Sequence, residues 1–140
     1  MDKIYNNLTI DNLVETDWFN QFHRDQKRII KEGLNKKLDV SIYANPIFKT
    51  YQMKEIKKGL EQNVDVSIYA KPEFDWEQMK QIRFGLIENL NVSIYAKKEF
   101  STSIMRLIRF DLKDGVDVSK YVKTNYNYFL MSFLSFGIRK

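Results

Sequence analysis

One short phrase occurs four times in this chain, and its spacing constrains the fold more than any other feature. "DVSIYA" stands at residues 39–44 and 65–70, "NVSIYA" at 91–96 and "DVSKYV" at 117–122. The period is 26 residues, without insertion or deletion. Such a period is typical of repeat arrays, in which each unit buries its apolar face against its neighbours.

Aligning the copies at this period brings like residues into columns. One column holds glycine three times and then aspartate, and tyrosine follows ten residues later in every copy: Gly33, Gly59, Gly85 and Asp111, with Tyr43, Tyr69, Tyr95 and Tyr121. We therefore predict a single domain over residues 1–140. It consists of a degenerate N-terminal cap (1–21), the repeats (22–125) and a C-terminal helix (126–140).

Each copy is predicted to contain a long helix and a short one. Apolar residues spaced by 3, 4 and 4 mark the inward stripe of an amphipathic helix at about residues 74–89, with equivalents one period away: Met79, Ile82, Leu86 and Leu90. The short helix follows in "VSIYA". Its N-caps are predicted from short polar side chains that can accept backbone N–H bonds: Asp65, Asn91 and Asp117.

The fold class that follows is all-α, an α-solenoid of about four 26-residue helix-turn-helix repeats plus a terminal helix. Glycine inside a long helix costs about 1 kcal/mol against alanine. Its recurrence predicts that another helix approaches closely at this point. Asp111 breaks the column, so we expect different packing there.

The composition excludes several kinds of site. The chain has no cysteine and a single histidine, so it can form neither a disulfide framework nor a thiolate or multi-histidine metal site. His23 is interpreted as solvated or locally hydrogen-bonded. No phosphate-binding glycine loop, nucleophile elbow or zinc-protease motif is present. We expect no enzyme activity, no cofactor, no metal and no small-molecule substrate.

The sequence also predicts no association with membranes. The N-terminal residues "MDKIYNNLTI" contain an acidic residue and no apolar run, unlike a secretory signal. No segment approaches the 18 or so uninterrupted apolar residues that a membrane-spanning helix needs. The expected location is therefore the cytoplasm, which is the host cytoplasm if a phage encodes the chain.

Two columns of the long helices stay basic through four copies, and they lie three residues apart on one helix face. Helices stacked about 8–10 Å apart would extend them over roughly 25–30 Å, close to one turn of a nucleic-acid duplex. We predict that these columns bind a partner: Arg28, Lys54, Lys80 and Arg106, with Lys31, Lys57, Arg83 and Arg109.

The partner of the basic columns is predicted to be RNA, DNA or an acidic protein surface. The formal net charge of +5 permits a polyanionic partner. The alternative is that these cations are ordinary solvated residues that duplication copied. Against that alternative, the position between the columns has changed freely from copy to copy: Ile29, Glu55, Gln81, Leu107 and Phe133.

The last segment, "NYNYFLMSFLSFGIRK", is apolar nearly all round. A terminal repeat should instead present a polar outer face. Phe129, Phe133 and Phe136 are therefore predicted to form an interface with a second copy or another partner. The alternative is that the segment is a cap folded over by the chain.

The stretch "YQMKEIKKGLEQNVDVSIYAKPEF", residues 51–74, resembles short helical repeats in proteins of phages, plasmids and conjugative elements of low-GC Gram-positive bacteria. The resemblance covers most of residues 22–122, with departures at Lys27, Lys98 and Asp111. It implies an anti-defence protein, such as an anti-CRISPR protein. Such a protein would inhibit or modulate a host defence nuclease by docking on the nuclease or on its nucleic acid.

Two other functions remain open at this point. One is direct binding of RNA or DNA by the helical repeats. The other is an adaptor between proteins that dimerises through its C-terminal helix.

Overall fold

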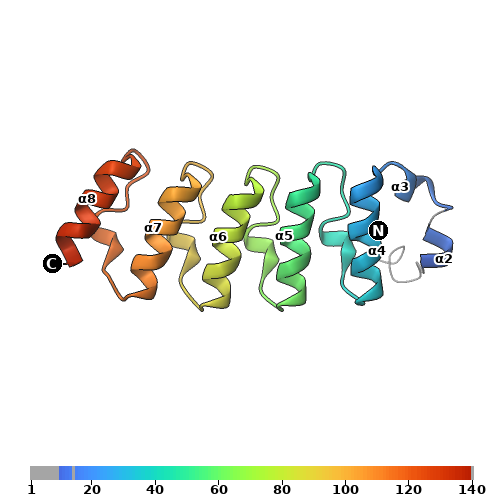
Figure 1. The fold of residues 1–140 in the computed structure, drawn as a ribbon, viewed down its shortest axis with the longest axis horizontal. Helices are drawn as coiled ribbons and strands as arrows, with labels where there is room; N and C mark the ends of the chain where they lie inside the picture. The colour runs from blue at the N-terminus through green and yellow to red at the C-terminus, as the bar shows by residue number, and fades with distance from the viewer. Residues whose placement is uncertain (1–9, 14, 140) are drawn as a thin grey trace. The chain divides into compact units, whose positions relative to one another are not determined.

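The computed structural model describes residues 10–13 and 15–139, and the regular structure among these residues is entirely helical (Figure 1). The five long helices each have twelve residues: α4 Arg24–Asn35, α5 Thr50–Glu61, α6 Trp76–Ile87, α7 Thr102–Lys113 and α8 Tyr128–Arg139. Two shorter helices precede them, α2 Ile10–Leu13 and α3 Asp17–Asn20. The predicted all-α class is confirmed.

A single 3-10 turn follows each of the first four long helices: η1 Val40–Ile42, η2 Val66–Ile68, η3 Val92–Ile94 and η4 Val118–Lys120. The predicted N-caps stand directly before these turns. The Asp65 carboxylate accepts from the backbone N–H of Ser67, as Asp117 does from Ser119. At Asn91 the side chain instead accepts from the Ser93 hydroxyl. The short helix is thus present, but it is a 3-10 turn of three residues.

The chain divides into two compact units, Met1–Pro72 and Glu73–Lys140. In the first unit α4 packs on α5, and α2 packs on α4. In the second unit α6 packs on α7, which packs on α8 (Figure 1). A single domain and the stacking of all copies into one solenoid both stay predictions.

A glutamine in the first turn of α4 ties the start of that helix to the loop that follows in the chain. The Gln26 side-chain oxygen accepts from the backbone N–H of His23 at 3.1 Å, and its side-chain nitrogen donates to the Phe48 carbonyl at 2.8 Å. The same pair of bonds recurs at Gln78, with Asp75 and Phe100. At Gln52 the side-chain oxygen accepts from Lys49, and the side-chain nitrogen donates to the Pro72 carbonyl in the equivalent loop. Each glutamine thus joins one 26-residue copy to the next loop.

The long helices α4 to α7 end in the same way, with one residue at positive φ: Lys37, Asn63, Asn89 and Gly115. After α4, the backbone N–H of Leu38 bonds to the Gly33 carbonyl at 2.9 Å, and that of Lys37 bonds to the Leu34 carbonyl at 3.0 Å. This pair of bonds is the Schellman motif, which satisfies the last carbonyls of a helix. It turns the chain back toward the long helix.

The glycine column leaves space for a tyrosine of the same copy. The Tyr69 hydroxyl donates to the Glu55 carbonyl of α5 at 2.7 Å, and a Cβ placed on Gly59 would lie 2.0 Å from that hydroxyl oxygen. Equivalent contacts join Tyr43 to Gly33 and Tyr95 to Gly85. The sequence predicted the close approach of another helix at this point. The space is instead taken by side chains of the 3-10 turn that follows in the same copy, Tyr69 and Val66 at Gly59.

Asp111 changes this contact in the fourth copy, as the sequence predicted. The Tyr121 hydroxyl donates to the Asp111 carboxylate instead of to a helix carbonyl. That carboxylate is buried and also accepts from the Ser135 hydroxyl and from the Arg139 guanidinium, both on α8. The carboxylate thus links η4, α7 and α8.

Gly59→Ala is expected to lower the free energy of unfolding by about 1–3 kcal/mol, because the new methyl group overlaps the Tyr69 hydroxyl and the Val66 side chain. The matched control is Gly137→Ala in α8, where nothing lies within 4 Å of the added Cβ. That control should gain up to about 1 kcal/mol from helix propensity. Urea unfolding measures both.

Adding Tyr69→Phe to Gly59→Ala removes the overlapping oxygen atom. The double variant should therefore lose less stability than the two single losses combined. Equal stability of Gly59→Ala and Gly137→Ala would contradict the contact.

Candidate nucleic-acid interface

An open groove of about 720 Å³ lies in the first unit, between the start of α4 and the start of α5. Three cations line it, together with one histidine and one exposed aromatic ring: Arg28, Lys49, Lys54, His23 and Tyr51. Asp25 is the one acidic residue in its lining. The groove therefore offers positive charge and an aromatic face to a ligand.

A second groove of about 510 Å³ adjoins the first along α4. Its lining combines one phenylalanine with five groups that are basic or can become so: Phe22, His23, Arg24, Lys27, Arg28 and Lys31. His23 and Arg28 line both grooves, so the two form one continuous surface. We call it the basic surface, with the six cations Arg24, Lys27, Arg28, Lys31, Lys49 and Lys54.

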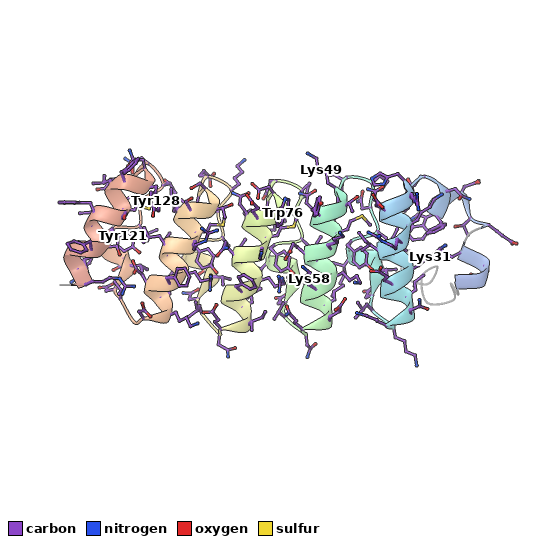
Figure 2. All side chains as sticks on the ribbon, viewed as in Figure 1. Lys31, Lys49, Lys58, Trp76, Tyr121 and Tyr128 are labelled. Atoms are coloured by element: carbon purple, nitrogen blue, oxygen red, sulfur yellow. The ribbon has the colours of Figure 1, made fainter. Side chains whose placement is uncertain are left out.

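The fold brings these residues together through the start of two helices. Lys49 precedes the first residue of α5, and Figure 2 shows it near the opposite end of that helix from Lys58. The glutamine bridge from Gln26 to the Phe48 carbonyl fixes this loop against the start of α4. The cations of one copy thereby lie beside those of the next.

The Lys54 ammonium lies 4.9 Å from the centroid of the Tyr51 ring, within range of a cation–π contact. The ring is 57% exposed. One side of the ring can therefore receive a planar group while the lysine supplies charge beside it. The sequence analysis did not anticipate Tyr51, Lys49 or His23 on this surface, because residues from two copies form it.

The second predicted basic column is not an exposed ladder. Lys57 bridges α4 and α5: its ammonium lies 3.1 Å from a Glu32 carboxylate oxygen and 3.0 Å from one of Glu61. The Lys57 side chain is only 13% exposed. The prediction that Lys57 faces a partner is wrong, because its charge is used between two helices of its own unit.

The pKa values of this bridge follow its geometry. Burial acts to lower the pKa of Lys57, but the hydrogen bonds with Glu61 and Glu32 outweigh it and raise that pKa. Burial likewise acts to raise the pKa of Glu61, but the hydrogen bonds from Lys57 and Lys36 outweigh it and lower that pKa. Both charged forms are therefore favoured in the folded protein.

The prediction that Arg83 and Arg109 of the same column face a partner is also wrong. Both are buried, with exposed fractions of 4% and 7%. The Arg109 guanidinium donates to the Gln81 side-chain oxygen on α6 at 3.0 Å and to the carboxylate of Glu88, the residue that follows α6. It also lies over the Phe84 ring, 5.2 Å from its centroid. This residue joins α7 to α6 and faces no partner.

The position between the two basic columns was interpreted as freely changing, but three of its five residues are buried. Ile29, Glu55 and Gln81 are buried. Changes at that position therefore reflect packing between helices, so they give no measure of how freely a solvated residue drifts.

The first column keeps its surface position. Arg28 and Arg106 are exposed, and Lys54 and Lys80 are partly exposed. In the second unit the Lys80 ammonium lies 6.0 Å from the Trp76 ring centroid and 5.7 Å from that of Phe84. A lysine beside a partly exposed aromatic ring thus occurs in each unit, on α5 and on α6.

The C-terminal helix exposes the three predicted interface residues. Phe129, Phe133 and Phe136 are 82%, 74% and 60% exposed. The predicted alternative, a folded-over cap, would leave these three side chains buried.

Other kinds of site find no support in the described part of the chain. Residues 10–13 and 15–139 hold no group of three or more side chains suited to a metal ion. Among the same residues no helix is long and apolar enough to cross a lipid bilayer.

Comparisons with known proteins identify no relative. No protein-family model matches the chain, no curated protein matches it, and no solved structure matches its fold.

Acid should weaken the Lys57 bridge. The folded-state pKa of Glu61 is lowered, so its contribution to stability is present above the ordinary glutamate pKa and is lost as the pH falls through the lowered value. Glu61→Gln should therefore reduce stability at neutral pH and flatten the decline below about pH 4.5. Because the pair is partly exposed, the effect should stay under about 1 kcal/mol.

The control for this prediction is Glu99→Gln, an exposed loop carboxylate. Urea unfolding at neutral and acid pH should show a decline for Glu99→Gln that parallels the parent protein. A parallel decline for Glu61→Gln as well would contradict the role of the bridge.

Proposed function

We propose that this protein is a non-enzymatic binding protein that takes up single-stranded RNA or DNA on the basic surface of its first unit. The observation that carries the proposal is the gathering of six cations from two helical copies around two adjoining grooves. Phosphate neutralisation by lysine and arginine supplies most of the affinity of such surfaces.

A single strand fits this surface better than a duplex. Single-strand binders combine a positively charged path with aromatic rings on which unpaired bases stack. Tyr51 provides such a ring beside Lys54, and it is more than half exposed. In the second unit Trp76 and Lys80 form the same combination of an aromatic ring and a lysine.

The arrangement we propose for the whole chain is one α-solenoid of four 26-residue copies followed by α8. The support is that the same contacts recur on both sides of the boundary between the units. The tyrosine–glycine contact is made by Gly59 in the first unit and by Gly85 in the second. The Gln52 bridge reaches the carbonyl of Pro72, the last residue of the first unit, as the Gln78 bridge reaches that of Lys98 in the second.

An anti-defence role stays a prediction. A protein that holds single-stranded nucleic acid could act on a host nuclease by occupying the nucleic acid that the nuclease needs. The proposed binding does not depend on that role, and recovery of a nuclease complex from a host lysate would test it separately.

Removing two charges of the basic surface should weaken binding of a labelled single-stranded oligonucleotide. In Arg28→Gln/Lys54→Gln, two phosphate contacts are lost. The slope of log affinity against log salt should therefore fall by about 1.4, because each contact on a single strand contributes about 0.7. Fluorescence anisotropy across a salt series measures this.

Tyr51→Ala should lose about 1–3 kcal/mol of binding energy per stacked base.

The charge-matched control is Lys37→Gln/Lys120→Gln, two exposed lysines outside both grooves. It should keep nearly the parent slope. The proposal fails if both double variants bind alike, or if the parent protein has no affinity at low salt. Binding of an acidic protein with no affinity for oligonucleotides would point to the alternative partner.

The solenoid is tested by deleting one full period, residues 49–74, which joins Phe48 to Asp75 in the register of Phe74 and Asp75. Since each copy of a solenoid contacts only its neighbours, the shortened chain should stay folded with less total helix. Circular dichroism and urea unfolding measure this. Loss of cooperative unfolding would contradict stacking in register.

A further inference from the structure

The face of α8 that carries Phe133 and Phe136 has a counterpart on α6, two periods earlier in the sequence. Phe133 takes the register of Gln81, and Phe136 takes that of Phe84. On α6 both positions contact Arg109 of α7. These are thus positions by which one long helix meets the next.

The first unit shows the same use of this face. Glu32 on α4 stands at the register of Phe136, and its carboxylate binds Lys57 of α5 at 3.1 Å. Ile29, at the register of Phe133, is 1% exposed, whereas Phe133 is 74% exposed. On α8 Phe133 and Phe136 therefore have the register of a helix–helix contact but are exposed, and Phe129 lies one turn before Phe133.

The other side of α8 is already packed on its own unit. Met131 and Ser135 are buried, and the Ser135 hydroxyl donates to Asp111 of α7. Arg139 makes ion pairs with Asp111 and Asp114. These contacts hold α8 in one rotation, so the three phenylalanines cannot turn inward.

The complementary face at the other end of the repeats is partly occupied by α3. Lys57 and Arg109 are the residues by which α5 and α7 meet the preceding helix, and Lys31 has their register on α4. The Lys31 ammonium lies 5.6 Å from the ring of Phe19 on α3, and that ring is buried. α3 therefore stands beside this face, which disfavours a head-to-tail contact with α8 of a second copy.

We propose that α8 pairs with α8 of a second copy of this chain, face to face across a two-fold axis, through Phe129, Phe133 and Phe136. The three positions carry no charge, so two identical faces meet without like-charge repulsion. A two-fold interface uses the same patch on both copies and closes at the dimer. The pairing continues, between two copies, the helix–helix contact that the register places here.

The six rings of two copies would remove on the order of 800 Å² from water. That area falls below the roughly 1,200 Å² at which stable protein interfaces begin. The dimer should therefore be reversible and depend on concentration. It does not require nucleic acid, so it can be tested without reference to the basic surface.

Sedimentation equilibrium across a wide range of protein concentrations is the first test. The parent protein should pass from the mass of one chain to twice that mass and stop there. Phe133→Asp should remain at the mass of one chain with an unchanged thermal midpoint, because the side chain is exposed in the monomer. Ile47→Asp, at an exposed apolar residue of a loop in the first unit, should dimerise like the parent.

Three outcomes of sedimentation would overturn the proposal. They are a parent protein that stays monomeric throughout, a Phe133→Asp variant that still dimerises, and a mass that rises beyond two chains. The last outcome would indicate a head-to-tail assembly.

Cysteine cross-linking is the second test, since the chain has no cysteine of its own. Phe133→Cys places one thiol at the centre of the proposed interface, and mild oxidation should join two copies. Ile47→Cys is the matched control and should cross-link far more slowly. Equal rates for the two variants would overturn the proposal.

Discussion

The hydrogen bond from a buried tyrosine hydroxyl to a helix carbonyl, made in the space that a glycine leaves, is the contact on which the first three 26-residue copies depend. This hydrogen bond attaches the 3-10 turn to the middle of the long helix that precedes it. The Tyr95 ring is fully buried, and its hydroxyl oxygen is the atom that a Cβ on Gly85 would meet first. The loss of helix propensity at the glycine is thus offset by a buried ring and a satisfied hydroxyl group.

Periodicity predicted the copies, their long helices and the special position of Asp111, because these depend on residue types at fixed spacing. Periodicity did not predict the glutamine bridges. Gln26 bonds to the Phe48 carbonyl 22 residues away, and because every residue has a backbone carbonyl, the residue types do not indicate which one a side chain will bind. The Schellman motifs at the helix ends were not predicted either. Glycine is the usual residue at the position of positive φ, but after α4 that position is occupied by Lys37.

The basic columns show that residue spacing alone does not predict which charged side chains of a helix face solvent. Lys54 and Lys57 are three residues apart, so they share one side of α5, yet the helix rotates by about 60° between them. That rotation is enough to place Lys54 on the groove and Lys57 between two helices. A column of lysine and arginine therefore predicts a charged position, and only the packing of the neighbouring helix decides whether the charge faces solvent.

Constancy of a column across copies has an internal cause when the column contacts the next copy. Arg109 binds Gln81 and Glu88, and Lys57 binds Glu32 and Glu61, so the column stays basic although its partners differ from copy to copy. On α8 the residues that face α7 keep this role through new partners, as Ser135 does with Asp111. α8 departs from the earlier copies on both sides. On its exposed side Phe129 and Phe133 replace Ser103 and Leu107 of α7, whereas Phe136 keeps the register of Phe110. On its packed side Ser135 replaces Arg109, and the buried contact survives because Asp111 accepts the serine hydroxyl.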